Sequence, residues 1–307
     1  MALIELENLE VSYGGREPAL RGVSCFIEGG AVGLLGPNGA GKSTIIKTLL
    51  GFIRPVSGTA RVMGYDLPRQ ALEVRQRMGY MPEREASSPK ISAVSFLTYC
   101  GRLFGMSRVD AMERTHEVLN YVGLGEARYR NMETYSTGML QRVKLAQSLV
   151  HDPKLLFLDE PTNGLDPDGR LEMLNLIREI LSARGVTVIL SSHLLPDVQH
   201  VCERVIMINK GRVIRDGLVR DLTAPKPRNC EIRVRDREAE FTALLAPMGV
   251  RWEKMQPSGI LQLDLPEGME PSGVFEAAHR AGTQVRHFQP SCRSLEEVFI
   301  QAIGEEN

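Results

Sequence analysis

The segment GPNGAGKST, positions 36–44, constrains the fold of this chain more than any other stretch. It fits the pattern G-x-x-x-x-G-K-[S/T], follows the strand-like apolar run Ala31–Leu35 and opens the helical pattern STIIKTLLG. Glycines let the backbone of such a loop curl until its N–H groups converge, and a helix N-terminus adds positive potential at the same place. The sequence therefore predicts a phosphate-binding loop between a buried strand and a helix.

Each residue of this loop is a candidate nucleotide contact. We expect Lys42 to reach the β- and γ-phosphates and the Ser43 hydroxyl to ligate Mg²⁺. A chance glycine-rich turn is disfavoured, because the strand, the loop and the helix occur in the order that the motif requires. The predicted contacts are Gly36, Pro37, Asn38, Gly39, Ala40, Gly41, Lys42, Ser43 and Thr44.

A second apolar run, Leu155–Leu158, ends in two carboxylates, Asp159 and Glu160. A buried strand of a parallel sheet presents its carboxyl end to the ligand, so we expect Asp159 to share Mg²⁺ with Ser43. Glu160 points in another direction and can polarise an attacking water. An isolated LDE would be an ordinary solvated strand end, but together with the phosphate loop it predicts a hydrolytic site.

The remaining pattern indicates an α/β fold. Short β-rich segments at Leu3–Val11 and Ala19–Ile27 come first, and helical spacing dominates from Ser92 to Val150. Strand-like runs then return at Val186–Leu190 and Val205–Ile208, with helices between them. This alternation is typical of a mainly parallel sheet.

The composition changes at TAPKPRN, Thr223–Asn229, which is typical of a linker. The chain beyond it shows the order βαββαβ, which suits a ferredoxin-like arrangement. We therefore expect two domains, residues 1–222 and a small α+β accessory domain of residues 223–307.

The charges nearly balance, with Lys+Arg 37 against Asp+Glu 38 in 307 residues. A nucleic-acid-binding chain usually carries a basic excess or stripe, so no nucleic-acid partner is expected. No apolar run approaches the roughly 18–20 residues that a membrane-spanning helix needs. We therefore expect the chain not to cross a bilayer by itself, although it could lie on one through a partner.

The motifs, taken together, resemble the ATP-binding subunit of an ABC transporter over about the first 220 residues. In chain order they are VSYGG, the phosphate loop, GYMPE, YSTGM, LLFLDEP, NGLD and SSH. The resemblance implies a P-loop ABC ATPase fold with a mainly parallel core, an antiparallel β subdomain and a helical subdomain. It also implies ATP and Mg²⁺ as cofactors and ATP hydrolysis as the activity.

The resemblance assigns further site residues. Tyr13 matches the aromatic residue that stacks on adenine, although a tyrosine that simply ends a strand is common. His193 matches the histidine that contacts the γ-phosphate and holds the water, which makes Glu160, His193 and Lys42 the expected catalytic residues. Asp166, in NGLD, matches a loop that crosses a dimer interface, and it also suits a plain helix N-cap.

Two positions depart from the family pattern. The signature usually written LSGGQ reads YSTGM, which retains Ser136 and Gly138. The resemblance implies that these two residues face the ATP held by a second copy in a head-to-tail dimer, and that losing the glutamine weakens the site at most. Where the family has glutamine in the loop after GYMP, this chain has Glu83. Its carboxylate could still bind Mg²⁺ or a water ligand, and we expect it to keep a link to a membrane partner.

The expected function is therefore that of an ATP-hydrolysing subunit that powers a separate integral membrane permease from the cytoplasmic face, without touching the cargo. The C-terminal SLEEVFIQAI and the signature region are similar to the ATPases of ABC-2-type exporters. The alternative is a soluble ABC-type mechanical or regulatory ATPase that acts on a ribosome or nucleic-acid partner. Such proteins usually carry a second cassette, a coiled-coil insertion or a zinc module, and this sequence contains none of them.

Overall fold

The computed structural model describes residues 2–14, 17–83, 90–256, 258–292 and 294–306. The chain divides into two compact units, Met1–Val219 with Ala302–Asn307, and Arg220–Gln301. Within the described residues, no helix combines the length and the apolar character needed to cross a bilayer.

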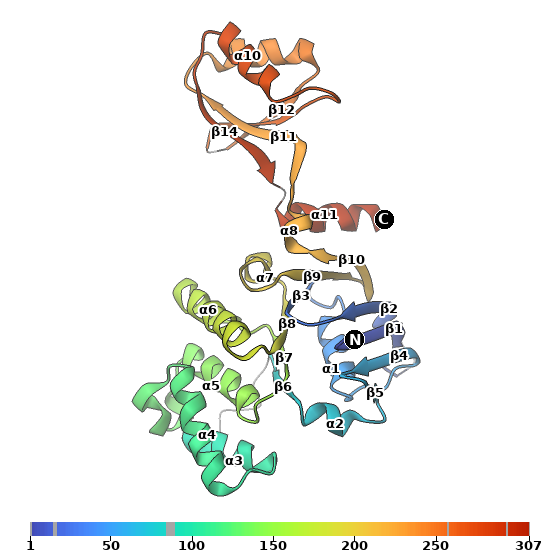
Figure 1. The fold of residues 1–307 in the computed structure, drawn as a ribbon, viewed down its shortest axis with the longest axis vertical. Helices are drawn as coiled ribbons and strands as arrows, with labels where there is room; N and C mark the ends of the chain where they lie inside the picture. The colour runs from blue at the N-terminus through green and yellow to red at the C-terminus, as the bar shows by residue number, and fades with distance from the viewer. Residues whose placement is uncertain (1, 15–16, 84–89, 257, 293, 307) are drawn as a thin grey trace. The chain divides into compact units, whose positions relative to one another are not determined.

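A six-stranded sheet forms the centre of the first unit (Figure 1). Its order is β10-β9-β3-β8-β7-β6, and every neighbouring pair is parallel except β10 with β9. The inner strands β3, β7 and β8 are buried along their whole length, as the unbroken apolar runs predicted. The strands are β3 (Ala31–Leu35), β6 (Met78–Met81), β7 (Leu155–Asp159), β8 (Thr187–Ser192), β9 (Arg204–Asn209) and β10 (Arg212–Leu218).

A four-stranded antiparallel sheet packs over this centre, with helix α1 (Lys42–Leu49) between the two sheets (Figure 1). One apolar core joins the three layers, because buried residues of both sheets and of α1 belong to the same cluster. The order is β2-β1-β4-β5, and α2 (Ala71–Arg75) follows it. The strands are β1 (Ile4–Val11), β2 (Leu20–Ile27), β4 (Ser57–Val62) and β5 (Tyr65–Leu67). The predicted antiparallel subdomain is confirmed.

Three helices form the predicted helical subdomain: α3 (Ala93–Leu103), α4 (Arg108–Tyr121) and α5 (Thr137–Leu149). Each begins after a serine whose hydroxyl accepts a hydrogen bond from a backbone N–H of the first turn. Such a side chain satisfies one of the donors that a helix start leaves unpaired. Helices α6 (Pro167–Arg184) and α7 (Leu195–Val201) then alternate with the strands of the parallel sheet.

The second unit contains an antiparallel sheet of order β12-β13-β11-β14 with helices α9 (Glu238–Leu245) and α10 (Ser272–Arg280). Its core includes Ile232, Phe241 and Leu263. The strands are β11 (Pro225–Val234), β12 (Arg251–Met255), β13 (Ile260–Asp264) and β14 (Val285–Cys292). Two further helices, α8 (Val219–Leu222) and α11 (Leu295–Glu306), lie at the ends of this part of the chain.

One prediction is wrong here, because most of the supposed linker Thr223–Asn229 belongs to β11. Pro225 pairs with Cys292 of β14, and Asn229 pairs with Asp264 of β13. Proline is acceptable at the first residue of a strand, where its missing N–H removes no bond from the middle of the ladder. That residues 223–307 form a separate domain stays a prediction.

Candidate functional site

The phosphate loop runs from the end of β3 into α1, and close neighbours require glycine at two of its positions, Gly36 and Gly41. A Cβ on Gly36 would lie 2.2 Å from the backbone oxygen of Ile208, and one on Gly41 would lie 2.8 Å from Cδ2 of Leu20. Gly41, the N-cap of α1, also has φ 114°, a conformation that side chains disfavour. No side chain caps α1 and no acidic residue stands in its first turn. The N–H groups at this helix start therefore remain available to an anion.

The close contact at Gly36 gives a first prediction. Gly36→Ala should destabilise the fold by about 1–3 kcal/mol, because the added methyl group meets strand backbone that cannot rotate away. Chemical denaturation measures this, and the free energy of unfolding should fall. Gly39→Ala is the control, since a Cβ there meets nothing within 4 Å and only the cost of φ 82° remains. Equal losses in the two variants would contradict the steric argument.

A hollow of about 330 Å³ lies over the loop. The strand ends bring Asp159 and Glu160 to it, and Glu83 joins them from the segment after β6. Tyr13, which is exposed, lies at its edge with its hydroxyl 3.3 Å from Oγ1 of Thr44. The lining residues are Ala19, Pro37, Asn38, Gly39, Ala40, Gly41, Lys42, Ser43, Thr44, Glu83, Asp159 and Glu160.

Lys42 folds back over the loop. Its ammonium group donates to the backbone oxygens of Gly36 at 2.6 Å and Pro37 at 3.3 Å, and lies 3.8 Å from Oε1 of Glu160. Burial lowers the pKa of Lys42, and the carboxylates of Glu160 and Asp159 act in the opposite direction. A buried ammonium group that is held by loop carbonyls can turn to a phosphate at little cost in desolvation.

Asp159 has the properties of a metal ligand. Its Oδ1 is buried and has no hydrogen-bond partner among the described residues. Burial raises the pKa of its carboxyl, and the nearby hydroxyls of Ser191 and Ser43 partly offset that rise. A carboxylate oxygen and a serine hydroxyl are hard oxygen donors of the kind that Mg²⁺ prefers. The residues present therefore fit a bound Mg²⁺.

Glu160 and His193 form a pair although they are far apart in the sequence. Nδ1 of His193 lies 2.9 Å from Oε2 of Glu160. The backbone of Glu160 has φ 51°, a conformation that is strained for such a residue and that clusters at functional sites. Burial raises the pKa of Glu160, while His193 and Lys42 lower it. This carboxylate is buried, oriented by a histidine and directed at the phosphate hollow.

Glu83 faces the hollow with an exposed side chain. Its backbone oxygen accepts a hydrogen bond from Nζ of Lys144, on α5, at 3.1 Å. Glu83 therefore connects the phosphate hollow with the helical subdomain. The residues that follow it, 84–89, lie outside the described chain.

The signature residues lie elsewhere. The Ser136 hydroxyl caps α5 by accepting from the Met139 N–H at 3.3 Å, and a Cβ on Gly138 would lie 3.7 Å from Leu165. Neither Ser136 nor Gly138 lines the described phosphate hollow. Asp166 caps α6 by accepting from the Gly169 N–H at 3.0 Å. Its predicted place at a dimer interface stays a prediction.

A buried carboxylate that the sequence did not predict, Asp197, lies behind the site. Asp197, on α7, accepts from the Thr162 hydroxyl at 2.5 Å and from Nε of Arg170 at 2.5 Å. The three residues lie in different segments of the chain, and no spacing rule connects them. One weak signal for an ion pair was present in the sequence: Arg170 lies in the first turn of α6 and Asp197 in the first turn of α7.

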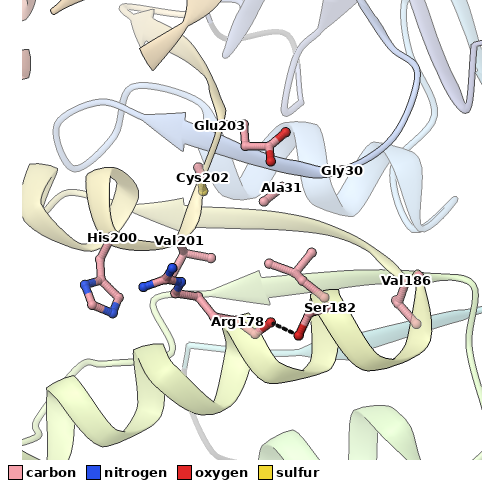
Figure 2. Close-up of a pocket in the computed structure, with 11 residues that line it drawn as sticks. Gly30, Ala31, Arg178, Ser182, Val186, His200, Val201, Cys202 and Glu203 are labelled. Carbon is pink, nitrogen blue, oxygen red and sulfur yellow. Dashed lines mark hydrogen bonds between the residues drawn. The ribbon is translucent and has the colours of Figure 1, made fainter. Parts of the chain in front are cut away.

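A larger hollow, of about 550 Å³, lies at the opposite end of β3 (Figure 2). It is bounded by Gly30 and Ala31 at the start of the strand, by the end of α6 and by the end of α7. Figure 2 shows Arg178, His200 and Glu203 around it, with the Ser182 hydroxyl donating to the backbone oxygen of Arg178. No residue of the phosphate site lines it, so size alone does not identify the catalytic centre.

Comparisons with known proteins agree with this geometry. Residues 20–163 match the family model described as ABC transporter. The chain is 34% identical to the uncharacterized ABC transporter ATP-binding protein YxlF of Bacillus subtilis, over 98% of this chain and 99% of that protein. It is 35% identical to the daunorubicin/doxorubicin resistance ATP-binding protein DrrA of Streptomyces peucetius, over 98% of this chain and 92% of that protein.

A solved structure extends the comparison to the fold. The structure of cbiO1 from Clostridium perfringens, part of the ABC transporter complex cbiONQ, superposes with a TM-score of 0.68. The alignment has 27% sequence identity and covers 73% of this chain and 91% of that one. The fold predicted from the sequence, that of a P-loop ABC ATPase, is confirmed. The chain belongs to the ABC transporter ATP-binding proteins and is an ATPase of that family.

Proposed function

We propose that two copies of this protein bind MgATP in a head-to-tail dimer and hydrolyse it to power a separate membrane permease, an exporter of the ABC-2 type. The observation that carries the proposal is the composition of the phosphate hollow. It holds the loop, Asp159 and Glu160, but neither Ser136 nor Gly138. Each chain thus has both parts of a nucleotide site, and the described fold keeps the two parts separate.

A second copy supplies the missing part. The N-terminus of α5 has exposed residues at Ser136 and Thr137 and no acidic residue in its first turn. Its backbone N–H groups and the positive end of the helix dipole suit the γ-phosphate of an ATP held by the partner. Closure then depends on ATP, because the γ-phosphate connects the two surfaces.

Mg²⁺ would be held by Ser43 and Asp159, with Glu83 as a further oxygen donor. When bound, it neutralises part of the charge on the phosphate oxygens. The unpaired Oδ1 of Asp159 supports this assignment.

The chemistry follows from the other groups. Water attacks the γ-phosphorus, the bond from that phosphorus to the β–γ bridging oxygen breaks, and ADP and inorganic phosphate leave. Glu160 accepts the proton of the attacking water, a role that its raised pKa favours. His193 holds the carboxylate of Glu160 in place, and the ammonium group of Lys42 stabilises the charge that develops on the phosphate.

An exposed apolar surface on the helical subdomain suits the permease. Tyr99 is 60% exposed, Leu103 68% and Val109 65%, while Ile91 and Phe104 are also exposed. Large exposed apolar side chains on and beside two neighbouring helices, α3 and α4, suit a protein contact. Docking here would place the chain at the cytoplasmic face of the membrane, with the cargo contacts left to the permease.

The direction of transport rests on likeness. The Streptomyces relative is named for resistance to two drugs. ATP-driven expulsion of a toxic compound from the cell gives resistance, so this name favours export. The relatives described above are named as transporter or resistance proteins. Their names give no support to the alternative of a ribosome or nucleic-acid partner.

Purification from detergent-solubilised membranes tests the proposal. We expect the full-length protein to co-purify with a protein that has several membrane-spanning helices, and its ATPase rate to change when the two are separated. Retention on a nucleic-acid column, with no membrane protein bound, would instead support the alternative.

Glu83→Gln should leave ATP turnover measurable, within about tenfold of the parent rate, because an amide oxygen can replace one carboxylate oxygen as a ligand or hydrogen-bond acceptor. Steady-state ATPase assays measure this. Complete loss of turnover would show that Glu83 is catalytic and would contradict its role as a connector to the permease.

A further inference from the structure

Thr162 lies two residues after Glu160, in a tight turn of the chain. The Asn163 N–H donates to the backbone oxygen of Glu160 at 3.1 Å, and the Leu165 N–H donates to that of Thr162 at 3.2 Å. These bonds join Thr162 and Glu160 in one short rigid unit. A displacement of Thr162 is therefore transmitted to the backbone of Glu160.

The carboxylate that holds Thr162 belongs to the helix after His193. Asp197 lies four residues beyond His193, in the first turn of α7, and its side chain is 1% exposed. One of its oxygens accepts from the Thr162 hydroxyl and the other from Nε of Arg170. A buried carboxylate that is bonded on both oxygens has a fixed position, because losing either partner exposes it to the cost of an unpaired buried charge.

The three residues thus connect the segment that carries Glu160 with the helix that follows His193. The Glu160–His193 distance of 2.9 Å is set from both sides, since Asp197 is close in sequence to His193 and Thr162 is close to Glu160. Arg170 adds a third point of attachment at the start of α6. The strained backbone of Glu160, φ 51°, requires such external support.

We propose that Thr162, Asp197 and Arg170 are positioning residues for hydrolysis, which hold the Glu160 carboxylate and the His193 ring in register. This inference rests on the proposed roles of Glu160 and His193. It adds that the bond between the Thr162 hydroxyl and Asp197 determines the rate of the chemical step and has little effect on ATP binding.

Thr162→Val tests the proposal most directly, because it removes the hydroxyl at nearly constant shape and leaves the Asp197–Arg170 ion pair intact. We expect kcat of the full-length protein to fall by roughly 10- to 100-fold, as misplacement of a catalytic group does, while KM for ATP changes by less than about twofold. Thr162→Ser keeps the hydroxyl and should restore kcat to within about threefold of the parent value.

A matched control separates positioning from general loss of stability. Thr115 is also fully buried and its hydroxyl accepts from that of Thr98 at 3.3 Å, but it lies in α4. Thr115→Val should leave kcat unchanged. If it lowers kcat as far as Thr162→Val does, the loss is structural and the proposal is wrong.

A double-mutant cycle with His193→Ala identifies the route of the effect. If Thr162 acts through the Glu160–His193 pair, Thr162→Val should lower kcat no further in the His193→Ala background. If the two reductions in kcat instead multiply in the double variant, the proposal is overturned. It is also overturned if Thr162→Val alone leaves kcat unchanged. The proposed function itself would fail in a different way, through a Glu160→Gln variant that still hydrolyses ATP at the parent rate.

Discussion

Glu160→Gln is expected to lower kcat for ATP hydrolysis by on the order of 10³-fold, because it removes the carboxylate that accepts the proton of the attacking water while preserving the shape of the side chain. Steady-state and single-turnover assays at saturating ATP measure the loss. An exposed glutamate on α6, Glu172, provides a matched control, and Glu172→Gln should retain the parent rate. Turnover of Glu160→Gln within about tenfold of the parent would show that another group accepts the proton.

The same variant should accumulate as an ATP-bound dimer. ATP is then bound but not consumed, so the γ-phosphate keeps connecting the phosphate loop of one copy with the Ser136 helix of the other. Light scattering after size exclusion should show twice the monomer mass with ATP and Mg²⁺, and the monomer mass with ADP. A monomer under the ATP condition would contradict the head-to-tail site, and so would a dimer that Ser136→Ala leaves unaffected.

The low activity of Glu160→Gln should not result from unfolding. Burial raises the pKa of Glu160 above that of an unfolded glutamate, so folding favours its protonated form. The carboxylate therefore opposes folding increasingly as pH rises from its unfolded pKa through its folded pKa. Glutamine removes this pH-dependent term. Denaturation of both proteins should show a smaller decrease of stability for Glu160→Gln across that pH range.

Lys42→Ala is expected to weaken ATP binding by roughly 10- to 100-fold, because it removes a charged hydrogen-bond donor to the phosphates. Titration calorimetry, or competition with a fluorescent nucleotide, measures the dissociation constant. Lys42→Arg keeps the charge but not the compact ammonium group, and we expect it to recover only part of the affinity. Unchanged affinity in Lys42→Ala would refute the assignment of the phosphate loop.

A neighbouring lysine excludes a general electrostatic explanation for that loss. Lys47 lies on the same helix but is exposed, so Lys47→Ala should bind ATP as the parent does. Lys42→Ala also removes the partner of the backbone oxygen of Gly36 and of Glu160. Circular dichroism must therefore show that the variant is folded before its affinity is interpreted.

Local features of the fold were predictable from the sequence. Strand β3 was placed at its observed bounds, and β7 and β8 lie within one or two residues of their predicted ends. These strands are unbroken apolar runs followed by turn residues or by charges, a pattern that strand formation and burial both favour. Strands β4, β5, β6 and β10 were not predicted. For β5 and β6 the reason is their length, because three or four residues carry too little pattern to be distinguished from a loop.

The supposed linker shows why proline alone is a poor guide. Pro225 and its neighbours form β11 because two other strands, β13 and β14, offer hydrogen bonds to that segment. Those partners lie more than thirty residues away along the chain, so local composition does not reveal them. Non-local pairing outweighed the local preference.

The sequence by itself determined the chemistry that is local: the glycine loop, the lysine and serine at the start of α1, and two carboxylates at the end of a buried strand. These depend on steric freedom and hydrogen bonds between residues a few positions apart. Only the tertiary structure decided that β3 lies between β8 and β9, that His193 meets Glu160, and that Thr162 and Arg170 converge on a buried Asp197. These contacts form because the parallel sheet aligns the carboxyl ends of distant strands and excludes water between them, and no short stretch of sequence encodes either effect.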